Sequence, residues 1–177
     1  NLSAQDTGSG LFQMRFSNDN ATWSAWETYA VTKAYSLTSG DGAKMVYVQY
    51  KDKTGNISTT YQSVIILDTT PPAKPLVTDE GETTTSTNTL IASWSSPDPE
   101  SEVVEYEYAI GTSLGSTDVV NWASTNNLNS IVRSGLNLFV GNTYYFSVKA
   151  CNSVGLWSEV GSSDGIKVIK TDEIIRK

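Results

Sequence analysis

Apolar and polar residues alternate along most of the chain, and this pattern predicts short β-strands rather than helices. Because successive side chains of a strand point to opposite faces, each alternating set should line one face of a strand and meet a core. Turn-forming Gly, Asn and Asp residues separate the sets, and such spacing predicts a β-sandwich. The sets are Phe12, Met14 and Phe16; Val46, Val48 and Tyr50; Leu90, Ala92 and Trp94; Tyr106, Tyr108 and Ile110; and Tyr144, Phe146, Val148 and Ala150.

A proline-rich stretch interrupts this pattern at residues 68–75. It contains Pro71, Pro72 and Pro75. Proline has a fixed φ and no amide donor, so the stretch cannot form a central strand. We therefore predict an extended linker at about 68–75, with a first domain at 1–70 and a second at 71–177.

The two halves follow one plan when they are aligned. Placing Val46 on Phe146 also places Gly55 on Gly155. The first half then has no counterpart of the segment from Pro75 to about residue 93, which should form the first two strands of the second half. We expect the missing strands in a longer polypeptide; the alternative is a strand donated by another chain.

Residues 75–170 resemble a fibronectin type III domain. The resemblance lies in Trp94, in Tyr106 and in the run 138–144, where Val140 takes the place of a usual proline. It implies that the Tyr144 hydroxyl bonds to backbone a few residues upstream. From the alternation, a shared core is expected to contain Trp94, Tyr106, Tyr144, Phe146 and Val148.

Residues 1–70 resemble the truncated Ig-like modules that bacterial surface proteins carry in tandem. The resemblance lies in Met14-x-Phe16, in Trp23-Ser24-x-Trp26 and in the glycine-rich turns near residues 40 and 55. The expected fold is thus all-β, with two tandem Ig-like or fibronectin type III β-sandwiches joined by the proline-rich linker. Such modules imply spacing, adhesion or assembly, although a fold alone does not specify a function.

Composition narrows the function classes further. The chain has no histidine, one cysteine and a net charge of −7. It therefore offers no Ser-His-Asp triad, no imidazole-dependent zinc site and no disulfide within the chain. An acidic surface disfavours nucleic acid, and no apolar run reaches the length of a membrane span. We predict that the protein is not an enzyme, has no cofactor and neither binds nucleic acid nor inserts into membranes.

Acidic residues form two candidate sites. A carboxylate pair could serve glycoside hydrolysis, but Glu105 and Glu107 alternate with core tyrosines and should face solvent together with Lys149. Calcium is a weaker alternative, because aspartates in turns usually bond to their own backbone. The acidic stretch comprises Asp98, Glu100, Glu102, Glu105 and Glu107, and the turn aspartates are Asp6, Asp41, Asp52, Asp98 and Asp164.

Tryptophans and the cysteine complete the candidates. Trp94 should belong to the core. If residues 23–26 form a strand, Trp23 and Trp26 point to opposite faces, so one is expected to be exposed. Trp122 or Trp26 could contact sugar rings, although packing explains such residues more often. Cys151 should lie on the outer face of its strand as an inert small residue.

Together these observations predict a non-catalytic structural or interaction module of a larger extracellular or cell-surface protein. Its role would be that of a spacer, an adhesion module or a unit of surface assembly. Expected partners are neighbouring domains of the same polypeptide, other surface proteins or polysaccharide. The alternative is an accessory module, contacting carbohydrate, of a secreted carbohydrate-active enzyme.

Overall fold

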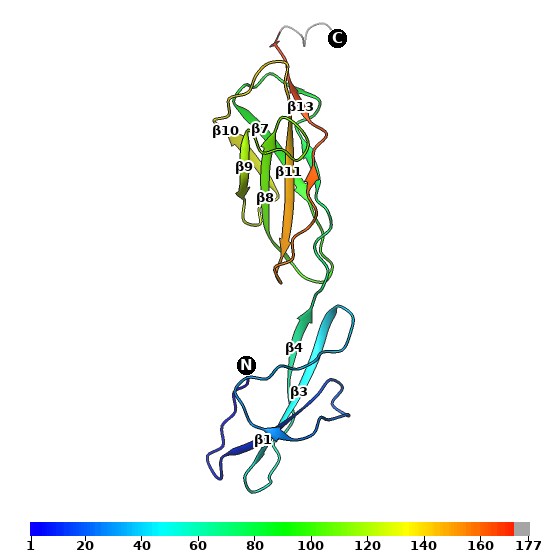
Figure 1. Ribbon diagram of the computed structural model, residues 1–177, viewed down its shortest axis with the longest axis vertical. Helices are drawn as coiled ribbons and strands as arrows, with labels where there is room; N and C mark the ends of the chain where they lie inside the picture. The colour runs from blue at the N-terminus through cyan, green and yellow to red at the C-terminus, as the bar shows by residue number, and fades with distance from the viewer. Residues whose placement is uncertain (172–177) are drawn as a thin grey trace. The chain divides into compact units, whose positions relative to one another are not determined.

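The computed structural model describes residues 1–171 and contains two compact units, Asn1–Asp68 and the chain from Thr69 onward (Figure 1). Its regular elements are all β-strands, so the predicted all-β fold is confirmed. Among these residues, no helix is long and apolar enough to cross a bilayer.

Unit 1, residues 1–68, contains one antiparallel sheet in the order β2-β1-β3-β4. One face of this sheet buries Met14, Phe16, Val48 and Tyr50. Irregular segments rather than a second sheet cover part of that face, and they contribute Leu2, Ala4, Tyr29 and Tyr35. The strands are β1 (Leu11–Ser17), β2 (Glu27–Thr28), β3 (Gly42–Asp52) and β4 (Tyr61–Leu67).

The start of β1 departs from simple alternation. Phe12 was expected on the face of Met14 and Phe16, but its side chain is 49% exposed. The pairing of β1 with β3 shifts register between Leu11 and Gln13, which is a β-bulge. A bulge adds one residue to one strand and reverses the side-chain direction there, so Leu11 packs against the core in place of Phe12.

Unit 2, from Thr69 onward, is a sandwich of two sheets around one core. One sheet has the order β10-β7-β5; the other runs β6-β13-β11-β8-β9, with β12 paired to β11. The strands are β5 (Leu76–Asp79), β6 (Thr83–Thr84), β7 (Thr89–Ser95), β8 (Val103–Gly111), β9 (Val120–Ser124), β10 (Ser130–Ser134), β11 (Thr143–Asn152), β12 (Gly161–Ser162) and β13 (Ile166–Val168).

The interior of unit 2 is a single cluster of buried side chains. The five residues proposed for a shared core all lie in it: Trp94, Tyr106, Tyr144, Phe146 and Val148. The Tyr144 side chain is almost fully buried, and its hydroxyl accepts a hydrogen bond of 2.8 Å from the amide of Phe139. This is the upstream backbone bond that the fibronectin type III resemblance implies.

The turns after β3 and β11 are built alike in the two units. The Ser58 hydroxyl accepts from the amide of Tyr50 at 3.1 Å, and the Ser158 hydroxyl accepts from the amide of Ala150 at 2.9 Å. The backbone amide of Ser58 also donates to the carbonyl of Tyr50 at 2.9 Å, and that of Ser158 donates to the carbonyl of Ala150 at 2.8 Å. Strand β3 therefore corresponds to β11, and the equivalent neighbours β1 and β8 pair with them.

Candidate functional site

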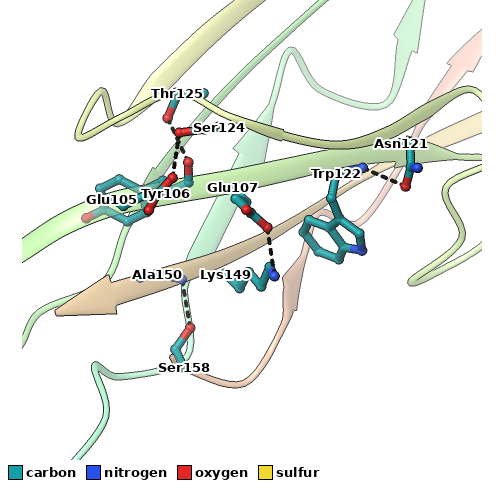
Figure 2. A network of polar contacts seen from close by, with 10 residues as sticks. All are labelled: Glu105, Tyr106, Glu107, Asn121, Trp122, Ser124, Thr125, Lys149, Ala150 and Ser158. Atoms are coloured by element: carbon teal, nitrogen blue, oxygen red, sulfur yellow. Dashed lines mark hydrogen bonds and ion pairs between the residues drawn. The ribbon is translucent and has the colours of Figure 1, made fainter. Parts of the chain in front are cut away.

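The outer face of the β8–β11 pair carries a cluster of charged and aromatic side chains. Lys149 Nζ lies 2.7 Å from a Glu107 carboxylate oxygen, 5.0 Å from the centre of the Trp122 ring and 4.4 Å from that of Trp157. Figure 2 shows Glu107, Lys149 and Trp122 converging from three neighbouring strands. We call Lys149, Glu107, Trp122 and Trp157 the Lys149 cluster.

This arrangement corrects the expectation that Glu105, Glu107 and Lys149 are exposed, because all three are half-buried. The Lys149 and Glu107 side chains retain 28% and 26% exposure. Glu105 accepts a hydrogen bond of 2.7 Å from the Ser124 hydroxyl (Figure 2). Alternation placed these residues on the outer face correctly, but bulky rings and neighbouring strands cover that face as well.

Unit 1 has a counterpart on the outer face of β1 and β3. The guanidinium carbon of Arg15 lies 4.8 Å from the Trp23 ring centre and 4.6 Å from that of Trp26, and Lys51 Nζ lies 4.3 Å from Trp26. Arg15 Nε and Nη2 donate to the Gln49 side-chain oxygen at 2.9 and 2.6 Å. We call Arg15, Trp23, Trp26, Gln49 and Lys51 the Arg15 cluster.

The Arg15 cluster overturns the expectation that Trp23 and Trp26 point to opposite faces. No strand spans residues 23–26, so the alternation rule does not apply there. Both rings instead flank one guanidinium, and both are half-buried. The sequence analysis missed Arg15 and Lys51, although each alternates with core residues of a predicted strand and so belongs to the outer face.

Trp94 lies in the core, where its ring stacks on Tyr108 with centroids 6.4 Å apart and an interplanar angle of 19°. Its relative exposure is 4%. Its indole nitrogen is buried without a hydrogen-bond partner among the described residues. A ring in this position packs two sheets together and has no access to a ligand.

Cys151 is buried, which corrects its expected exposure on the outer face of β11. The chain turns back after β11, and Trp157 forms an antiparallel bridge with Cys151 that covers this part of the face. The thiol donates to the Asn152 carbonyl at 3.5 Å. Burial, together with the charge of nearby Glu105, raises the pKa of Cys151 above its ordinary value, which keeps the thiol protonated and unreactive.

Carboxylates of the acidic stretch bond to different parts of the fold. Asp98 accepts from the amides of Glu100 and Ser101 at 3.1 and 2.9 Å, and from the Asn152 side-chain amide at 3.1 Å. Its carboxylate therefore shapes the loop that leads into β8. Glu105 and Glu107 serve separate partners, and Glu102 is exposed. The two glutamates that alternate with core tyrosines are thus bonded within the fold, Glu105 to Ser124 and Glu107 to Lys149.

The turn aspartates also bond mainly to local backbone. Asp6 accepts from the amides of Gly8 and Gly10 at 3.0 and 2.6 Å, and Asp52 accepts from the amides of Thr54 and Asn56 at 2.9 and 2.8 Å. Asp41 lies in the bend before β3, and Asp164 lies in the segment between β12 and β13. Among residues 1–171, no group of three or more acidic or cysteine side chains is placed to hold a metal ion.

Two carboxylates that were not candidates from the sequence, Asp19 and Asp118, also bond to loops. Amides of Thr22 and Ala21 and the Ser17 hydroxyl hold the pKa of Asp19 well below its ordinary value. The hydroxyl of Ser116 and the amide and hydroxyl of Thr112 do the same for the pKa of Asp118. A carboxylate that accepts several such bonds is stabilised in its charged form.

No family model matches the chain, and no curated protein matches it. Among solved structures it is similar to the fibronectin(III)-like modules of Clostridium thermocellum CbhA, with 13% identity and a TM-score of 0.50, over 96% of this chain and 84% of that one. It is also similar to titin domains A168-A170, with 17% identity and a TM-score of 0.49, over 89% of this chain and 54% of that one.

A third similar structure comprises the chicken CNTN1 FN1-FN3 domains, with 18% identity and a TM-score of 0.47, over 90% of this chain and 56% of that one. The chain thus spans little more than half of the titin and CNTN1 structures. The likeness to the CbhA modules, together with the two-layered core of unit 2, gives the conclusion that the sequence resemblance predicted: this chain contains a fibronectin type III-like β-sandwich domain.

Proposed function

We propose that this chain is a non-catalytic structural or interaction module of a larger extracellular or cell-surface protein. It would hold neighbouring domains apart, or contribute to adhesion or surface assembly. The observation that carries the proposal is the use of its charged and aromatic side chains within the fold. At the level of fold, the similarity to fibronectin(III)-like modules supports a non-catalytic role.

Individual charged side chains of unit 2 support this proposal, because each bonds to other groups of the fold. Lys149 is taken up by Glu107 and two rings, and Asp98 by a loop and Asn152. A hollow of about 480 Å³ in this unit is lined by Asp118 and Arg133 among other residues. Its carboxylate, however, already accepts from the Thr112 amide at 3.0 Å, so the group serves the loop rather than a reacting molecule.

Mechanical pulling tests the spacer role. When unit 2 is held at its two ends, we expect it to resist force and then to unfold in one step. The chain should lengthen by roughly 300 Å in that step, because the residues from β5 to β13 become fully extended. Phe146→Ala, which removes a ring from the middle of the core, should lower the force at that step. Gradual extension without a step would contradict a spacer that resists mechanical force.

The alternative, an accessory module that contacts carbohydrate, is favoured by one observation. The Trp157 ring is 38% exposed although it contacts Lys149. If this alternative holds, polysaccharide binding should be lost in Trp157→Ala and retained in Trp94→Phe, whose ring is buried. Glycan-array screening of the two variants distinguishes the proposals, since a spacer without sugar contacts gives no signal with either one.

A further inference from the structure

The inner face of the unit 1 sheet is open at positions where unit 2 is covered. A hollow of about 490 Å³ lies over Phe16, Val46, Val48 and Ile65. Another of about 480 Å³ lies beside Ala4, Leu11, Tyr50 and Tyr61. In unit 2 the corresponding face packs against β7 and β5, through Leu90, Ala92, Trp94 and Val77.

Residues 1–4 already occupy the place of one end of β7. The amide of Leu2 donates to the carbonyl of Val31 at 2.8 Å, as the amide of Trp94 donates to that of Asn129 at 2.9 Å. Both side chains join the core of their unit. Asp6 and Asp98 then follow at the same spacing, and each accepts bonds from the loop that leads into the next strand.

We propose that the open face of unit 1 binds an extended strand of the same polypeptide, in line with residues 1–4, and a second strand paired to it as β5 pairs to β7. Apolar residues two and four positions ahead of Leu2 would fill the hollow over Phe16 and Val48, because alternate residues of a strand share one face. The equivalent residues in unit 2 are Ala92 and Leu90.

The second hollow also has a counterpart that unit 2 fills. There, the backbone of Pro75 lies so close to Gly161 that a side chain at Gly161 would collide with it. Asn152 also donates to the carbonyl of Thr70 at 3.1 Å. Unit 1 has Tyr61 at the position of Gly161, beside the hollow. Tyr61 cannot admit backbone as closely as Gly161 admits Pro75, so the chain that leads into the proposed outer strand is expected to pass beside the Tyr61 ring rather than in the position of Pro75.

The side chains of β4 indicate that the strand bound beside it is apolar and uncharged. Tyr61, Val64, Ile65 and Ile66 of this edge strand are each 44–56% exposed, and the strand carries no charge or proline. Exposed edges of this kind pair readily with other strands. In unit 2 the equivalent edge, β13, is paired by β6, which belongs to the same segment as β5 and β7.

A graft tests the proposal in the full chain. Residues 72–92 are duplicated ahead of Asn1, so that a copy of Ala92 precedes Asn1 in the register of β7. We expect hydrogen exchange of the β3 and β4 amides to slow by about tenfold or more, while unit 2 serves as an internal reference. The matched control graft carries lysine in place of the copies of Leu90 and Ala92, the two residues that should enter the hollow, and should give no protection.

The proposal is wrong if the two grafts protect β3 and β4 equally, or if neither does. A second outcome also contradicts the proposal. If hydrogen-exchange protection of β4 in the ungrafted chain rises with protein concentration, and Ile65→Lys abolishes it, a second copy of the chain covers the face. Val132→Lys, which changes an exposed residue on β10, is the matched surface control for that variant.

Discussion

The two units are alike on the outer face of their sheet and unlike on the inner face. Outside, a cation lies between two tryptophan rings in each, Arg15 in unit 1 and Lys149 in unit 2. Inside, unit 2 has a complete second sheet, whereas unit 1 has irregular segments and two hollows. The outer clusters therefore do not require the second sheet.

This difference follows from where the contributing residues lie in the sequence. The Arg15 cluster draws on β1 and β3, which pair within one sheet, and on the irregular segment that follows β1. The inner face needs strands from outside that sheet to cover it, and in unit 2 they come from β5, β7 and β10. A sheet can thus keep the side-chain cluster on its outer face while its inner face is only partly covered.

The largest effect is expected in the complete core. Phe146→Ala removes a fully buried ring from unit 2 and should lower the free energy of unfolding by about 3–5 kcal/mol, through lost burial and a residual cavity. Urea unfolding followed by tryptophan fluorescence measures it. A loss under about 1 kcal/mol would mean that the ring is not enclosed by both sheets.

A matched pair of valines compares the two inner faces directly. Val148→Ala in unit 2 should cost about 2–3 kcal/mol of unfolding free energy, whereas Val48→Ala at the equivalent position of unit 1 should cost about 1 kcal/mol. Both residues are buried, but Val48 also lines a hollow, so fewer atoms surround it. Unit-resolved hydrogen exchange gives both values. Equal losses would show that the hollow does not weaken the unit 1 core.

The outer clusters should differ in their response to salt. A double-mutant cycle with Glu107→Gln and Lys149→Met should give a coupling of about 1 kcal/mol that shrinks at high salt, because two charges interact in a half-buried site. The matching cycle with Arg15→Met and Gln49→Leu pairs a charge with a neutral amide, so its coupling should change less with salt. Identical salt responses would contradict the assignment of Glu107 as the charged partner.

The smallest effect concerns acid stability. The pKa of Asp19 and that of Asp118 are lowered from 3.8, so the folded state binds fewer protons than the unfolded chain at acid pH. Their contribution is present above the ordinary pKa and is lost as the pH falls below it. Asp19→Asn should flatten the decline in unfolding temperature between about pH 5 and pH 2. Asp164→Asn is the control, and an equal flattening there would contradict the role of the Asp19 loop.

The sequence by itself determined five of the strands (β1, β3, β7, β8 and β11), most of their inward positions and the all-β fold class. Alternation identified Tyr106, Tyr144 and Phe146 as core residues, and all three are buried. The Tyr144 hydroxyl bond was implied by the fibronectin type III resemblance, and the structure contains it. Local patterns suffice for the inward positions, since the period of a strand is set by backbone geometry alone.

Only the tertiary structure decided what covers each face. Alternation placed Lys149 and Cys151 on the outer face, yet Lys149 is half-buried between rings and Cys151 is buried beneath a returning segment. The bulge that exposes Phe12 depends on register with β3. Trp23 and Trp26 meet at Arg15 because the chain between them is not a strand. Each of these outcomes depends on contacts between segments distant in sequence, and side-chain periodicity carries no information about those contacts.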